Sequence, residues 1–142
     1  MRLVNTKVHA VLDYLLGLTL LGAPWFFNYP PSGPKYIVPL IVGLVAAATA
    51  LVTRFEYSPF KIVPLKVHLL IDLLSGITLA VSPWLFGFHE TVFKPHLVFG
   101  LTHAVVALIT DHMLYDKVKD IKVRTDAEGN VLPGKINEKN KS

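Results

Sequence analysis

The sequence contains no cysteine, and only 17% of its 142 residues are charged. Without cysteine, the chain can form neither a disulfide nor a thiolate metal site. Soluble domains have about a quarter charged residues, so the shortage of charge argues against an ordinary water-soluble domain. Hydrophobic residues make up 52% of the chain, and its mean hydropathy is +0.49. These values are typical of a membrane protein.

Four long apolar blocks account for most of this hydrophobicity. They cover residues 7–28, 36–53, 65–87 and 95–115. A helix crosses the hydrocarbon layer, which is about 30 Å thick, with about 20 residues, so each block is long enough to span a membrane. A helix of a soluble bundle needs a polar stripe on its outer face, but the stretch 37–52 has a single polar residue, Thr49. We predict an all-α, polytopic membrane protein with four transmembrane helices.

The chain contains an internal repeat. Residues 7–28 and 66–87 are identical at 11 of 22 positions at a constant offset of 59. The second and fourth blocks align more weakly, at an offset of 57, through four residues: Gly43, Thr53, Gly100 and Thr110. We therefore predict two tandem helical hairpins that enter the membrane in the same direction, as parallel repeats do. The predicted divisions are a first repeat at 1–58, a second repeat at 59–115 and a polar cytoplasmic tail at 116–142.

Positive charge is distributed unevenly over the predicted loops. With four spans, both termini and the connection 54–66 lie on one side of the membrane. That side holds 12 of the 14 lysines and arginines, and the other side holds only Lys35 and Lys94. The positive-inside rule then places both termini in the cytoplasm, and we expect the protein in the cell (inner) membrane. The bilayer is the expected partner, a homo-oligomer or a larger membrane assembly is a further candidate, and nucleic-acid binding is not expected.

Proline and tryptophan close the first helix of each repeat. The two motifs are Ala23-Pro24-Trp25 and Ser82-Pro83-Trp84. Proline ends or kinks a helix, and tryptophan favours the membrane–water interface, so we expect these six residues to be structural. With its doubled hairpins, the chain resembles the SPW-repeat family of small membrane proteins, named for a Ser-Pro-Trp motif. The resemblance covers roughly residues 7–115 and implies two-helix units, but no particular activity.

Polar residues recur at matching positions inside the apolar blocks. His9 and Asp13 are four residues apart, as are His68 and Asp72, so each pair lies on one helix face. An ionisable residue at mid-membrane costs about 2.5–3.5 kcal/mol and therefore faces the bundle interior with a partner. The predicted polar cluster comprises His9, Asp13, His68, Asp72, His103, Asp111 and His112. His89 and His96 fall in or beside an outer loop, where we expect them to be solvated or at headgroup level.

Three functions are compatible with this cluster. The first is a structural or accessory protein in which interhelical hydrogen bonds orient the helices and hold the two repeats in register. The second is a proton or ion relay, or a small transporter subunit, that uses His9, Asp13, His68 and Asp72. The third is intramembrane metal or haem binding with His9 and His68 as imidazole ligands.

Motifs of known catalytic sites are missing. The sequence has no nucleophile elbow, P-loop or HExxH pattern. We therefore name no catalytic residue, lean against an enzyme and predict no cofactor, while the third interpretation leaves a metal open.

Overall fold

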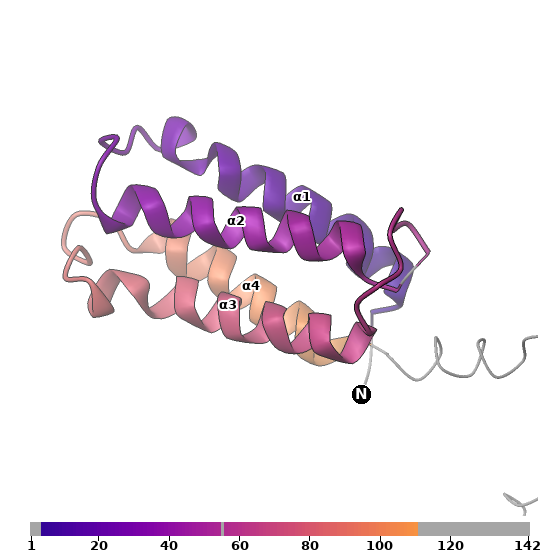
Figure 1. Ribbon diagram of the computed structural model, residues 1–142. Coiled ribbons are helices and arrows are strands. Elements are labelled where there is room, and N and C mark those ends of the chain that lie inside the picture. Colours follow the sequence, from indigo (N-terminus) through magenta and orange to yellow (C-terminus); the bar gives the residue numbers. More distant parts are fainter. Residues whose placement is uncertain (1–3, 55, 111–142) are drawn as a thin grey trace, which may run out of the picture. The chain divides into compact units, whose positions relative to one another are not determined.

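Four helices form the part of the chain that the computed structural model describes, residues 4–54 and 56–110 (Figure 1). They are α1 (Thr6–Phe26), α2 (Pro34–Val52), α3 (Leu65–Leu85) and α4 (Lys94–Ile109). Within those residues there is no β-strand, only isolated bridges that join Val4 to Thr110 and Thr53 to Val63. The predicted all-α fold is confirmed. The predicted tail at 116–142 lies outside the described residues.

Three of the helices are long and apolar enough to cross a membrane. These are α1, α2 and α3, with 21, 19 and 21 residues. Helix α4 is shorter. Its 16 described residues extend about 24 Å, which is less than the thickness of the hydrocarbon layer. The predicted fourth block continues to residue 115, and residues 111–115 lie outside the described part.

The distribution of side chains is the reverse of that in a water-soluble bundle. Large apolar side chains cover the outside, among them Leu15, Leu44 and Leu108, each more than half exposed. The buried set includes histidines, aspartates and threonines. In water, aspartate is almost never fully buried unless paired, and leucine is usually inside. An apolar exterior around a polar interior suits a bundle surrounded by lipid, so the chain is an integral membrane protein.

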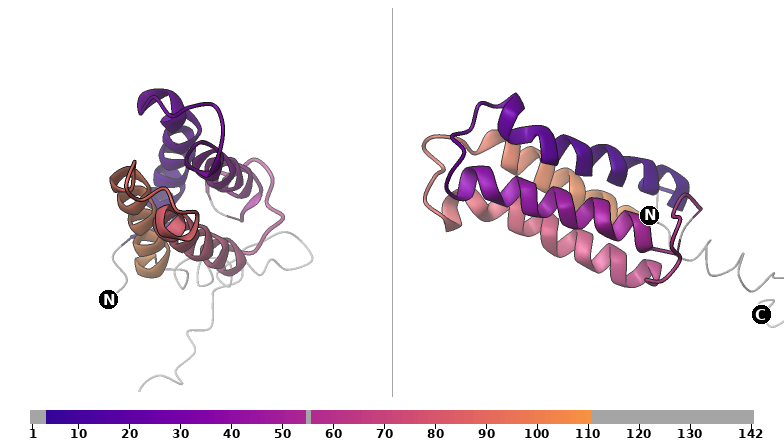
Figure 2. Two further views of the ribbon diagram at one scale, coloured as in Figure 1. Left: turned by 90° about the vertical axis from the view of Figure 1, so that its left-hand side faces the viewer. Right: turned by 45° about the horizontal axis from the view of Figure 1, so that its top comes forward.

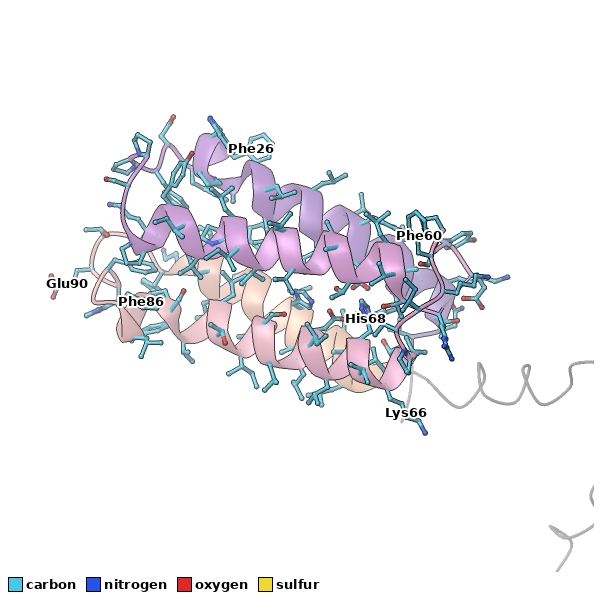
Figure 3. All side chains as sticks on the ribbon, viewed as in Figure 1. Phe26, Phe60, Lys66, His68, Phe86 and Glu90 are labelled. Carbon is cyan, nitrogen blue, oxygen red and sulfur yellow. The ribbon has the colours of Figure 1, made fainter. Side chains whose placement is uncertain are left out.

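The helices pair as two hairpins that run in the same direction. Helix α1 packs mainly on α2, and α3 mainly on α4, with fewer contacts between the hairpins. Figure 2 shows the resulting four-helix bundle end-on and from the side. In Figure 3, Phe26 and Phe86 mark one end of the bundle, while Phe60 and Lys66 mark the other. Helices α1 and α3 therefore begin at the same end, as the predicted parallel repeat requires.

Glycine permits close packing inside each hairpin. A Cβ atom built on Gly43 would lie 2.9 Å from the carbonyl oxygen of Gly17, and one on Gly100 would lie 2.6 Å from that of Gly76. Side chains at these positions would push the two backbones apart. In a membrane, where the lipid is as apolar as leucine, such close backbone contact is a main source of helix association.

The proline–tryptophan motifs terminate α1 and α3 in the same way. Pro24 and Pro83 each lie in the last turn, and each helix ends two residues later. The carbonyl oxygen of each proline then accepts a hydrogen bond of 2.8 Å from a loop amide, that of Tyr29 in the first repeat and that of Phe88 in the second. The first helix of each hairpin thus ends in the same way, as the common sequence predicts.

Candidate functional site

The candidate site lies near the beginning of α1 and α3. His9 is the fourth residue of α1 and His68 the fourth of α3, and each helix places its aspartate, Asp13 or Asp72, one turn further on. All four residues are at most 2% exposed. Both helices turn these residues toward the bundle interior because their remaining faces carry apolar side chains that meet lipid.

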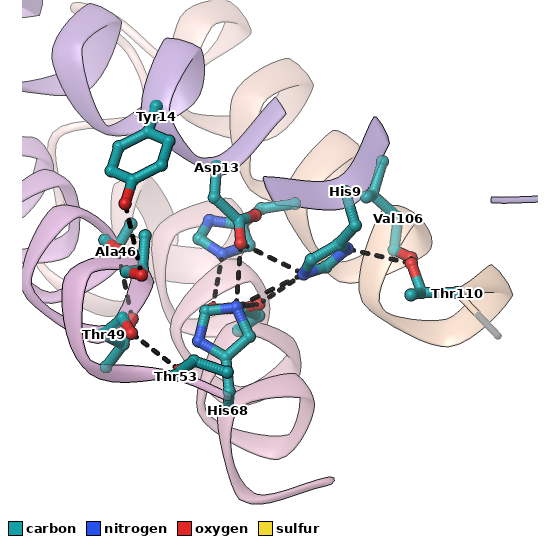
Figure 4. A network of polar contacts seen from close by, with 12 residues as sticks. His9, Asp13, Tyr14, Ala46, Thr49, Thr53, His68, Val106 and Thr110 are labelled. Carbon is teal, nitrogen blue, oxygen red and sulfur yellow. Dashed lines mark hydrogen bonds and ion pairs between the residues drawn. The ribbon is translucent and has the colours of Figure 1, made fainter. Parts of the chain in front are cut away.

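The four side chains converge across the two repeats (Figure 4). His68 Nε2 lies 2.8 Å from Oδ2 of Asp13 and 3.0 Å from Oδ2 of Asp72. His9 Nε2 lies 3.1 Å from the same oxygen of Asp13 and 3.2 Å from that of Asp72. Each imidazole therefore contacts the carboxylate of its own repeat and that of the other repeat.

The two imidazoles also meet each other directly. Their Nε2 atoms are 3.3 Å apart, and the rings are nearly perpendicular, at 81°. One nitrogen or oxygen from each of the four residues lies within 4.8 Å of the other three. We call these four residues the His/Asp cluster.

A threonine that follows α4 sets the orientation of the His9 ring. Thr110 Oγ1 lies 2.9 Å from His9 Nδ1 and 2.6 Å from the carbonyl oxygen of Val106. A hydroxyl has one proton, and a carbonyl oxygen can only accept, so that proton goes to Val106. Thr110 then accepts a hydrogen bond from Nδ1–H of His9. In the neutral imidazole, this leaves the lone pair on Nε2, which faces the cluster.

Thr53 occupies the equivalent position in the first repeat. Thr53 caps the end of α2 as Thr110 caps the end of α4, and its side chain is fully buried. Its hydroxyl donates to the carbonyl oxygen of Thr49 at 2.7 Å (Figure 4). The internal repeat pairs Thr53 with Thr110, but neither was among the predicted site residues.

The comparisons with known proteins identify the family. The family model for the SPW repeat domain matches residues 7–110. The chain belongs to the SPW repeat family. No curated protein and no solved structure matches it. In this SPW repeat protein, the matched region contains both hairpins and the entire His/Asp cluster.

His103 extends the cluster of this SPW repeat protein toward α4. Its Nε2 lies 3.2 Å from Oδ1 of Asp72, and the residue is 2% exposed. A cavity of about 160 Å³ lies between α1 and α4 and is lined by Asp13, His103, two threonines (Thr19 and Thr102) and apolar side chains. The structure thus brings five of the seven predicted cluster residues together. The other two, Asp111 and His112, lie outside the described residues.

The opposite end of the bundle corrects one prediction. His96 was expected to be solvated or at headgroup level, but it is 2% exposed. Its ring packs against those of Tyr29, at a centroid distance of 5.7 Å, and Phe88, at 5.0 Å. The loop residues fold back over the start of α4, and linear sequence does not reveal such a contact. Burial also raises the pKa of the Tyr29 phenol to about 12.

Proposed function

We propose that this integral membrane protein has a structural or accessory role, in which the His/Asp cluster joins its two repeats into one four-helix unit. The observation that carries the proposal is the exchange of partners between repeats. His68 of the second repeat lies 2.8 Å from Asp13 of the first, and His9 of the first lies 3.2 Å from Asp72 of the second.

The surrounding contacts explain why such a joint is needed. Each hairpin has its own close glycine packing, whereas contacts between the hairpins are fewer. Apolar side chains gain little from mutual burial in lipid, and intramembrane polar contacts contribute about 0.6 kcal/mol on average. Several such contacts concentrated at one point between the hairpins favour a single relative placement of the repeats.

The same proposal includes an orientation in the cell (inner) membrane with both termini in the cytoplasm. Arg54, Lys61 and Lys66 support it, since all three are exposed on the connection or helix start at the cluster end of the bundle. Lys94 is at the opposite end, where α4 begins. Under the positive-inside rule, the cluster then lies in the cytoplasmic half of the bilayer.

The proposal is tested by replacing the carboxylates in the full chain. Asp13→Asn and Asp72→Asn keep the side-chain shape but remove the charge, so we expect both variants to melt at a lower temperature in detergent than the wild type. Thr19→Val on α1 is the matched control, because the Thr19 hydroxyl donates to the Leu15 carbonyl of its own helix, at 2.7 Å.

Two results would contradict this role. One is unchanged melting of both aspartate variants. The other is a proton flux through the wild-type protein in liposomes that both aspartate variants abolish, which would favour the relay. The structural role is supported if the wild-type protein conducts no protons and if the aspartate variants, but not Thr19→Val, lower the melting temperature.

A further inference from the structure

The cluster has the composition and spacing of a metal site. We propose that His9, Asp13, His68 and Asp72 bind one divalent transition-metal ion of the zinc class between the two repeats. The proposal rests on the proposed function, since it specifies what holds the joint together.

The first argument is geometric. Zinc binds histidine nitrogen and carboxylate oxygen at about 2.0–2.2 Å, so neighbouring ligands of a regular tetrahedron are about 3.3–3.6 Å apart. Five separations join the two Nε2 atoms to each other and to the two Oδ2 atoms, and they range from 2.8 to 3.3 Å. One donor atom from each of the four groups lies within 4.8 Å of the other three, so an ion at the centre requires the imidazoles and carboxylates to shift toward a tetrahedral arrangement.

The second argument concerns protons and charge. Thr110 accepts a hydrogen bond from Nδ1–H of His9, so the Nε2 lone pair of the neutral ring faces two carboxylate oxygens that are also acceptors. A single proton on His68 Nε2 would be shared among three acceptors, His9 Nε2 and the two carboxylate oxygens, and protons on both Nε2 atoms would set two N–H donors against each other at 3.3 Å. A divalent cation resolves both conflicts, because every facing atom is then a ligand. It also balances the two carboxylates, so the site enters the membrane without net charge.

The donor set selects the kind of ion. Magnesium and calcium prefer ligand sets made of oxygen, whereas imidazole nitrogen suits zinc and its neighbours among the transition metals. Four protein ligands fill a tetrahedral shell, which is the arrangement of structural rather than catalytic zinc. Such an ion would join α1 to α3 and hence the first repeat to the second.

The groups behind the ligands are those that a metal site needs. Metal-bound histidines usually donate their second ring N–H to an oxygen, which fixes the ring, and His9 does so to Thr110. His103 approaches the second carboxylate oxygen of Asp72, at 3.2 Å, while Oδ2 of Asp72 faces the centre of the cluster. The hydrogen bond to Thr110 fixes the His9 ring from outside the cluster.

The experiment measures metal in the full chain, purified in mild detergent without a polyhistidine tag. We expect about one zinc ion per chain by elemental analysis. After removal of zinc with a chelator, Co²⁺ should bind at the same ratio and give the intense visible bands of a tetrahedral site. Asp13→Asn and Asp72→Asn should lose most of this binding, whereas His89→Gln, a variant of an exposed histidine outside the cluster, should retain it.

Several results would overturn the metal site. The first is a wild-type protein that binds no stoichiometric metal after exposure to Zn²⁺ or Co²⁺. The second is a cobalt spectrum typical of octahedral coordination. The third is metal that stays bound in both aspartate variants, which would show an adventitious ion only. The titration of the wild-type protein needs no variant, so poor folding of a variant cannot hide the answer.

The experiment distinguishes failure of the metal proposal from failure of the proposed structural role. If no metal binds but Asp13→Asn lowers the melting temperature, the His/Asp cluster joins the two repeats through hydrogen bonds, and the metal proposal is wrong. If one metal binds but its removal and the aspartate substitutions leave melting unchanged, the metal site stands and the structural role is wrong.

Discussion

The Nε2 atom of His68 lies closer to Oδ2 of Asp13, at 2.8 Å, than to Oδ2 of Asp72 on its own helix, at 3.0 Å. Fifty-five residues separate His68 from Asp13, so this contact exists only because the second repeat packs against the first. A contact within one helix orients a side chain, whereas a contact between repeats decides how the two halves of the bundle are placed.

The contact between His68 and Asp13 should show energetic coupling. We expect Asp13→Asn and His68→Gln each to destabilise the protein by about 1–3 kcal/mol, because each leaves a buried polar partner unsatisfied. Together they should cost less than the sum of the two, with a coupling of about 0.5–3 kcal/mol. Reversible unfolding in detergent for both single variants and the double variant measures it, and strict additivity would contradict a direct interaction.

Thr110 should matter for metal affinity through the ring of His9. Thr110→Val removes the acceptor of Nδ1–H, and loss of such a contact typically weakens metal binding about 10–100-fold. Thr102→Val is the control on α4, since the exposed Thr102 hydroxyl donates to the Val98 carbonyl of its own helix, at 2.8 Å. Competition with a chromophoric chelator gives both affinities, and equal affinities for the two variants would show that Thr110 does not position His9.

Packing within the hairpins should be more sensitive at Gly100 than at Gly17. A Cβ atom on Gly100 would collide with the backbone nitrogen of Ala80 and would lie 2.6 Å from the carbonyl oxygen of Gly76, whereas at Gly17 its nearest neighbours are 3.3 Å away. We expect Gly100→Ala to cost about 1–3 kcal/mol, as overpacking does, and Gly17→Ala to cost less. Thermal melting compares the two, and the reverse order would contradict the packing of α3 on α4.

The orientation can be read from single cysteines, because the natural chain has none. Tyr57→Cys lies in the connection between α2 and α3, and Glu90→Cys lies in the loop before α4, both at exposed positions. Neither substitution removes a positive charge. In intact cells, a membrane-impermeant maleimide should label Glu90→Cys alone, and Tyr57→Cys should react only after the membrane is opened. The opposite pattern would place the termini outside.

The buried phenol of Tyr29 should make stability fall at high pH. Its pKa is raised to about 12 by burial, above the usual value of about 10, so the folded state keeps a proton that the unfolded state loses. This contribution is fully present below pH 10 and is lost as the pH rises from about 10 to 12. Melting curves across that range should show a smaller decline for Tyr29→Phe than for the wild type, and identical declines would contradict the burial of this hydroxyl.

Properties that depend on neighbouring residues in the chain, or on its internal repeat, could be predicted from the sequence. Hydropathy over about 20 residues predicts a helix that crosses lipid, and the 59-residue offset predicts parallel hairpins, because copies of one sequence fold alike. The four-residue spacing of His9 and Asp13 places both on one face of α1, since that spacing is close to one helical turn. All of these follow from the geometry of a single helix or of one repeated unit.

Contacts between helices required the three-dimensional arrangement. The rotation of α1 against α3 brings His68 to Asp13, and the end of α4 brings Thr110 to His9. The fold of the loop after α1 buries His96 beneath Tyr29. Pairs so distant in sequence leave no periodic signal, because their contact depends on how the helices rotate and pack. The chain's own pattern therefore determines the helices and their pairing, while packing between the repeats determines which polar groups share one centre.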